Sequence, residues 1–350
     1  MAKPVQNICR MLIIFAFLFC SCDHKAQPQF SEEFVTTQLE LYTLLSDKNL
    51  SPESKFSVIN QISTNLLSLE KNSDLILFLT DYVKRNPEDK FNAYWLLMTA
   101  YAYQQSGADP IAELYFERII RNYDDLIVQD KSIHKICLQN LVQISTSAEN
   151  RVDYFNRLIN GFSNEVNKTE LYFRLAQEYE TLGNWNQVLT AYSLFLSQPD
   201  AATSQIAGIP DAYNQARKLI DFNNSPKDWT FESLEALETA IKSAISRYNY
   251  TALDRYKSKV NFFAMSWKQE DTDANSQQSF SMRDYGTGNR IRFNTQLDES
   301  SNPNEAYLRT WGWSQYVNVW YLYFRKVNFP VDPEIHGRWE WAGIYFGEKL

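Results

Sequence analysis

Two helical patterns meet at a glycine in residues 171–199, which read LYFRLAQEYETLGNWNQVLTAYSLFLSQP. Apolar positions recur at steps of three and four, the period of a helix face, at Tyr172, Leu175, Ala176, Tyr179, Val188, Tyr192 and Phe195. Gly183 stands where the chain must reverse, Trp185 follows it, and Pro199 ends the second pattern. The stretch therefore predicts two antiparallel helices joined by a tight turn.

A second stretch with the same plan surrounds Gly107. Its pattern consists of Leu96, Ala100, Tyr103, Ala112, Phe116 and Ile119. Gly107 and Gly183 are 76 residues apart, which is two steps of 38, and a weaker copy at 136–144 and 152–159 lies between them. Small residues at the alanine positions would let the paired helices approach closely.

Both stretches resemble the tetratricopeptide repeat, whose unit is about 34 residues long. The residues that carry the resemblance form a repeat signature: Ala100, Tyr103, Gly107, Ala112, Phe116, Ala176, Tyr179, Gly183, Trp185, Tyr192 and Pro199. The resemblance implies a mainly α solenoid over residues 31–222, with a concave groove that binds extended peptides or partner domains. The segment 112–123 is also similar to a repeat helix of outer-membrane assembly lipoproteins. The alternative is an irregular helical bundle without true repeats.

The N-terminus has the three parts of a secretory signal peptide. Lys3 and Arg10 supply positive charge, residues 11–19 form an uncharged apolar core, and Ser21 precedes Cys22. The apolar run is much shorter than the roughly 20 residues that a membrane-spanning helix needs. These features predict export of the chain without a transmembrane anchor.

Ser21-Cys22 resembles the lipobox of bacterial lipoproteins. The resemblance implies a signal peptide at 1–21, lipid on the Cys22 thiol, a polar tether at 22–30 and attachment to a membrane of the cell envelope. Phe19 and Cys20 depart from the usual lipobox residues. The alternative is an ordinary signal peptide that is cut near Cys22, and whether the inner or the outer membrane holds the anchor is left open.

Composition argues against several classes of function. The chain has 34 lysines and arginines against 42 aspartates and glutamates and no basic run, so we expect no nucleic-acid partner. Cys137 lies in an apolar helical context and is expected to be a buried thiol. A Cys/His zinc site needs three or four ligands, and after the predicted signal peptide and the lipidated Cys22 the chain has only Cys137 and scattered histidines, which do not form such a set. No EF-hand spacing of acids is present either. We therefore expect no metal and no cofactor.

The helical pattern ends near 221–226, and residues 229–350 predict a small α+β domain with an antiparallel sheet. Helices are expected at 231–248 and 251–258, and strands at 260–267, 279–283, 290–297, 306–313, 317–327 and 339–346. Two helices on a curved sheet are similar in outline to the nuclear-transport-factor-like fold, which often encloses a pocket.

Large aromatic side chains are concentrated in this second domain, since six of the nine tryptophans follow residue 260. They fill a small hydrophobic core in one interpretation. In the other they line a pocket for a glycan, a lipid tail or a peptide. The candidate pocket residues are Trp311, Trp313, Trp320, Trp339 and Trp341.

Motifs for catalysis are weak. The chain has no nucleophile elbow, phosphate loop or His-Glu-x-x-His motif. The best group of ionisable residues surrounds His336 in 332–340, and it also contains the proline and glycine of a connecting loop. We therefore do not expect an enzyme. The sequence predicts an envelope lipoprotein that holds envelope proteins in its repeat groove. The alternatives are small-ligand binding by the C-terminal domain or an enzyme that acts on envelope polymers.

Overall fold

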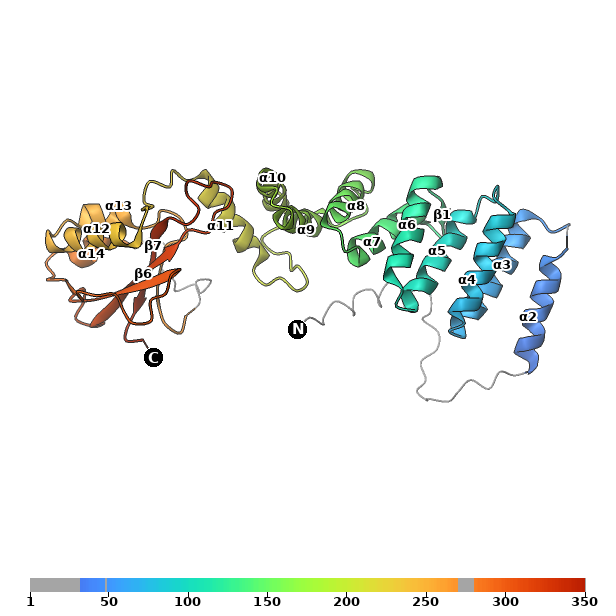
Figure 1. The fold of residues 1–350 in the computed structure, drawn as a ribbon, viewed down its shortest axis with the longest axis horizontal. Coiled ribbons are helices and arrows are strands. Elements are labelled where there is room, and N and C mark those ends of the chain that lie inside the picture. Colours follow the sequence, from blue (N-terminus) through green and yellow to red (C-terminus); the bar gives the residue numbers. More distant parts are fainter. Residues whose placement is uncertain (1–31, 48, 270–279, 350) are drawn as a thin grey trace. The chain divides into compact units, whose positions relative to one another are not determined.

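A computed structural model describes residues 32–47, 49–269 and 280–349, which fall in two compact units. The first unit runs to Leu182 and includes residues 206–210, and the second contains residues 183–205 and those from Asp211 onward. The predicted order is confirmed, because a long helical part is followed by a part with helices and a five-stranded sheet (Figure 1). None of the described helices is long and apolar enough to cross a membrane.

Helices make up nearly all of the first unit. They are α2 (Glu32–Leu45), α3 (Pro52–Ser68), α4 (Asn72–Arg85), α5 (Asn92–Gln105), α6 (Asp109–Asn122), α7 (Ile133–Ile144), α8 (Ala148–Gly161) and α9 (Lys168–Thr181). A short hairpin of β1 (Ile127–Val128) and β2 (Lys131–Ser132) precedes α7. Each helix packs against the next in the chain, and one hydrophobic core extends from Val58 on α3 to Leu158 on α8.

Local sequence explains where several of these helices begin. The side chains of Ser51, Ser132, Ser147 and Asn167 each accept a hydrogen bond from the backbone N–H three residues later, which caps α3, α7, α8 and α9. Gly107 separates α5 from α6 with a φ of +74°, a conformation that side chains with a Cβ rarely adopt. The predicted turn glycine therefore adopts the backbone conformation that lets the chain reverse between α5 and α6.

The second unit begins with helices and ends with a sheet. Its helices are α10 (Trp185–Leu196), α11 (Ala212–Asn224), α12 (Leu234–Ser246), α13 (Tyr250–Tyr256) and α14 (Met282–Gly286). Its strands are β3 (Phe263–Ser266), β4 (Arg292–Phe293), β5 (Glu305–Trp311), β6 (Val319–Lys326) and β7 (Trp339–Phe346), in the spatial order β3-β7-β6-β5-β4. The pairs β4–β5, β5–β6 and β6–β7 are antiparallel, and β6 has an irregularity in register at Tyr323 and Phe324.

Two predictions for the sheet were wrong. β3 pairs parallel with β7, in the register Phe263 to Gly343, so the sheet is mixed and not antiparallel. The reason is the connection between the two strands. α14, β4, β5 and β6 lie between β3 and β7 in the chain, so no hairpin turn joins β3 to β7 and their pairing need not be antiparallel. The strand predicted at 279–283 is replaced in its described part by α14, where the backbone N–H of Met282 donates to Asp254 of α13.

The core of the second unit lies between α12, α13 and α14 and one face of the sheet (Figure 1). Leu237 and Ile241 of α12 pack there with Leu322 and Phe324 of β6 and with Trp341 of β7. The opposite face of the sheet carries a second aromatic cluster that includes Phe263, Tyr307, Tyr321 and Tyr323. Both faces of β6 are therefore apolar, which agrees with its place inside the sheet.

One carboxylate is buried next to this sheet. The Glu340 side chain of β7 is 2 % exposed. Its Oε2 accepts a hydrogen bond of 2.9 Å from the indole N–H of Trp229, and its Oε1 accepts one of 2.9 Å from Nε of Arg325 on β6. A buried carboxylate needs such donors because it has lost its water. Glu340 thus joins the segment before α12 to the centre of the sheet.

Candidate functional site

Alternate helices of the first unit lie side by side and are joined by polar side chains. The Tyr94 hydroxyl of α5 donates to Asn60 Oδ1 of α3 at 3.0 Å, and Asn140 Nδ2 of α7 donates to the Tyr101 hydroxyl of α5 at 3.2 Å. Burial raises the pKa of Tyr94, so its hydroxyl remains a donor at neutral pH. These bonds align α3, α5 and α7 in one layer.

The intervening helices form similar contacts with each other. The Tyr154 hydroxyl of α8 donates to the Glu117 carboxylate of α6, and Arg157 of α8 donates to the Ile120 carbonyl of α6 at 3.4 Å. Consecutive helices therefore alternate between two layers in this part of the unit, with α3, α5 and α7 in one and α6 and α8 in the other.

The two layers differ in charge. Helix α5 has no charged residue, and α3 and α7 carry acidic or basic residues only within their first four positions. Helices α6 and α8 carry acidic and basic side chains along most of their length, and α4 carries them near its start and toward its end. The uncharged character ends at α9, which contains Glu170, Arg174 and Glu178. One layer of the unit therefore has no acidic or basic residue in α5, nor beyond the first four positions of α3 and α7.

One side of this layer carries hydroxyl and amide side chains, of which Asn140 is buried and the others are partly or fully exposed. We define the uncharged face as Asn60, Thr64, Tyr94, Tyr101, Gln104, Asn140 and Gln143. Asn60, Tyr94, Tyr101 and Asn140 make the contacts between helices. Thr64, Gln104 and Gln143 follow them at helical steps of three or four residues, which places them on the same side of their helices. The face offers donors and acceptors without an ionic group.

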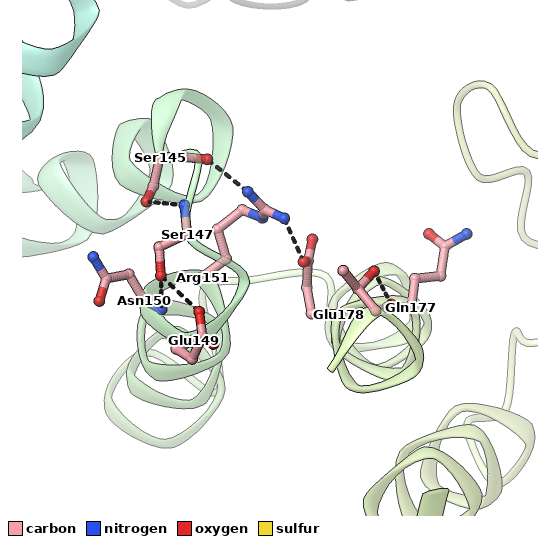
Figure 2. A network of polar contacts seen from close by, with 8 residues as sticks. Ser145, Ser147, Glu149, Asn150, Arg151, Gln177 and Glu178 are labelled. Carbon is pink, nitrogen blue, oxygen red and sulfur yellow. Dashed lines mark hydrogen bonds and ion pairs between the residues drawn. The ribbon is translucent and has the colours of Figure 1, made fainter. Parts of the chain in front are cut away.

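Arg151 holds the far end of this layer to α8 and α9 (Figure 2). Its Nη1 donates to the Ser145 carbonyl at the end of α7 at 2.7 Å, and its Nη2 lies 2.6 Å from Glu178 Oε2 on α9. The side chains of Arg151 and Glu178 are 20 % and 16 % exposed. A guanidinium with its donors fixed in a plane suits such a joint, because one side chain satisfies two partners in set directions.

Replacing Arg151 by methionine is expected to lower the free energy of unfolding of the first unit by about 2 kcal/mol, because it leaves the Glu178 carboxylate and the Ser145 carbonyl without their donor. Urea denaturation followed by far-ultraviolet circular dichroism would measure the loss. The double variant Arg151→Met with Glu178→Met should recover part of it, since no partly buried charge is left alone. A double variant as unstable as the sum of both single variants would contradict this account.

The residues of the repeat signature are placed as follows. Ala100, Ala112, Phe116 and Ala176 are fully buried, Tyr192 is buried, Trp185 is half-buried and Pro199 is exposed. Gly183, like Gly107, has a positive φ, of +70°. Tyr103 stacks on Tyr115 of α6 at 5.3 Å, and the Tyr179 hydroxyl accepts a hydrogen bond from Asn156 of α8 at 3.4 Å. Tyr103 and Tyr179 thus make contacts between helices, and the predicted lipidation residue Cys22 lies outside the described residues.

The candidate tryptophan pocket is filled by its own side chains. Trp313, Trp320 and Trp341 are buried in the core between helices and sheet, and the rings of Trp313 and Trp320 stack at 5.2 Å. Trp339 is also buried, and Trp311 lies half-buried below the guanidinium of Arg309. The geometry therefore favours the interpretation of these rings as core.

The ionisable group around His336 is organised as a loop. His336 Nδ1 accepts a hydrogen bond from the Phe329 backbone N–H at 3.2 Å, and Asp332 Oδ1 accepts one from the Glu334 N–H at 3.0 Å. Both side chains thus bind neighbouring backbone, as turn residues do. Among the described residues, no group of three or more His, Cys, Asp or Glu is arranged to hold a metal ion. Cys137 is fully buried, as predicted, and burial raises the pKa of its thiol.

A scan against protein-family models finds no match to this chain, and a search of curated proteins finds no similar sequence. Four of the five tryptophan candidates are buried in the core and His336 bonds to loop backbone, whereas the uncharged face is a surface with a distinct chemistry. The uncharged face could have been found in the sequence, because residues 56–69 and 92–105 contain no acidic or basic residue. The repeat pattern alone does not reveal it.

Proposed function

We propose that this protein is a lipid-anchored lipoprotein of the bacterial cell envelope that holds partner proteins on a tetratricopeptide-like solenoid. Cys22 carries the lipid, residues 22–30 form the tether, and the helical repeats bind the partner. The uncharged face of α3, α5 and α7 is the single observation that carries the binding role. The alternation of helices between two layers supports a solenoid, because stacked helix pairs bury one continuous core and present one layer to partners.

The chemistry of the face indicates the kind of partner. Hydroxyl and amide groups can both donate and accept, which suits the alternating N–H and C=O groups of an extended polypeptide. An acidic or basic peptide would find no ion pair there. We therefore propose that the partner contributes an extended segment without charged side chains, and that the charged helices α4, α6 and α8 remain in contact with water.

Placing charge on the face should abolish this binding. The variant Gln104→Glu with Gln143→Glu puts two carboxylates beside Tyr101 and Asn140, and an interface would have to bury them without a cation. An unpaired buried charge costs several kcal/mol, so recovery of crosslinked partners from envelope membranes should fall about tenfold or more. The measurement is a crosslinking pull-down with the full lipidated chain as bait and mass spectrometry as readout.

The matched control is Asn122→Glu with Asn160→Glu, near the ends of α6 and α8. Gln104, Gln143 and Asn160 are the penultimate residues of their helices and Asn122 is the last residue of α6, so the unfavourable interaction of an added acid with the helix C-terminus is similar in both pairs. The control should capture the same proteins as the native chain. Equal loss in both pairs, or no loss in the first, would rule out the uncharged face as the binding surface.

A further inference from the structure

A cavity of about 330 Å³ lies in the second unit between helix α11 and the strands. Phe222, Phe263 and Phe329 contribute apolar walls, and Asn261, Arg325 and Glu340 contribute polar groups. The Asn261 side chain also donates to the Lys218 carbonyl of α11 at 3.2 Å, which fixes the helix beside the strands. The volume and the mixture of apolar walls with few polar groups are typical of sites for small molecules.

Arg325 is the polar group best placed to meet a ligand. Its Nε donates to the buried Glu340 carboxylate, and its side chain is 38 % exposed. In the described part of the chain, no hydrogen bond or ion pair involves its two terminal nitrogens. Because Trp229 and Arg325 both hold Glu340, the guanidinium plane is fixed before any ligand arrives. A guanidinium that is held in place and has two terminal nitrogens available can donate two parallel hydrogen bonds to a planar carboxylate.

The charge around the cavity also favours an anion. Lys218 and Lys326 line it together with Arg325, and Glu340 is its one acidic lining residue. The cavity is thus locally basic in a chain with a net charge of −8. Because Nε of Arg325 is already paired with Glu340, its two terminal nitrogens can form one planar bidentate contact, which matches the geometry of a carboxylate.

We infer that this cavity binds a small monocarboxylate with an apolar or aromatic body. The carboxylate pairs with the terminal nitrogens of Arg325, and the body packs between Phe222, Phe263 and Phe329. Glu340 is a positioning residue that acts through Arg325. This inference is independent of the proposed scaffold role, which concerns the first unit.

The test uses N-acetyl-L-phenylalanine as probe and its uncharged amide as matched ligand. The indole N–H resonance of Trp229, identified by its loss in Trp229→Phe, reports on the site in the full chain in detergent. The acid should shift this resonance in a saturable way, with a Kd on the order of 1 mM or lower. This value follows from the binding free energy per non-hydrogen atom that is typical of small ligands. The amide, and the acid with Arg325→Lys, should bind about tenfold more weakly, because the charged bidentate contact is lost.

A second pair of variants leaves the ion pair intact. Asn328 is exposed and lines the cavity, so Asn328→Trp should block the probe, whereas Asn318→Trp, at an exposed position before β6 that is not among the lining residues, should not. Equal binding of acid and amide, no saturable shift with the acid, or unchanged binding in Asn328→Trp would overturn the inference. Tighter binding of phenyl phosphate than of the acid would overturn the assignment of the ligand as a monocarboxylate.

Discussion

Replacing Arg325 by leucine is expected to lower the free energy of unfolding of the second unit by about 3–5 kcal/mol. The Glu340 side chain is 2 % exposed and would keep only the Trp229 indole as donor. A carboxylate in that position has neither water nor a counter-ion, so the folded state must hold an uncompensated charge or bind a proton. Urea denaturation followed by tryptophan fluorescence would measure the loss, since most tryptophans lie in this unit.

The double variant Arg325→Leu with Glu340→Leu is the decisive comparison. Replacing both members of a buried ion pair by apolar residues is often close to neutral. Here the Trp229 N–H loses its acceptor, which costs about 1–3 kcal/mol. We therefore expect the double variant to be more stable than Arg325→Leu alone. If it were less stable, the ion pair itself would be contributing to stability, and the loss in the single variant would not come from an isolated charge.

Replacing Cys22 by serine is expected to abolish lipidation of the protein and to leave its signal peptide uncleaved. The proposed anchor consists of acyl chains, each buried methylene of which contributes about 0.8 kcal/mol, so two chains hold a protein far more firmly than one. A serine hydroxyl cannot replace the thiol in the lipidation implied by the lipobox resemblance. Fractionation of membranes, together with the intact mass of the protein, would measure the change, and the variant should remain as a full-length, unlipidated precursor.

Cys20→Ser is the matched control for this experiment, because it removes a thiol two residues away and leaves Ser21-Cys22 unchanged. It should be processed and anchored like the native chain. Normal processing and membrane attachment of Cys22→Ser would contradict the lipoprotein proposal and favour an ordinary signal peptide.

Local patterns in the sequence were enough to predict a helical part followed by a part with helices and a sheet. Caps such as Ser51, the turn glycine Gly107 and the apolar and aromatic residues of β5 and β7 act within a few residues, so one sequence shows them. The partner of β3 and the helical state of Met282–Gly286 depend on contacts with distant segments, which no local pattern contains. Periodicity alone therefore could not distinguish α14 from a strand.

The same limit applies to the candidate sites. Alternation along a strand assigns Trp320 and Trp341 to a face, but only the packed helices show that this face is covered. The cavity beside Arg325 joins α11 to strands that are far away in the chain, so no motif indicated it. The uncharged face could have been found in the sequence by comparing the charges of successive helices, because it depends on composition and not on contacts.

The parallel pairing of β3 with β7 has a consequence for folding. Phe263 meets Gly343 across 80 residues of chain, and β7 is also the partner of β6. Pairing over such a separation carries a large loop-closure entropy and slows folding. Until β7 is synthesised, β3 has no strand to pair with. The edge of β6 that pairs with β7 then has unpaired backbone groups, between two sheet faces rich in aromatic residues. The second unit must therefore assemble late and as a whole, and a chain stalled before β7 would present strand edges prone to aggregation.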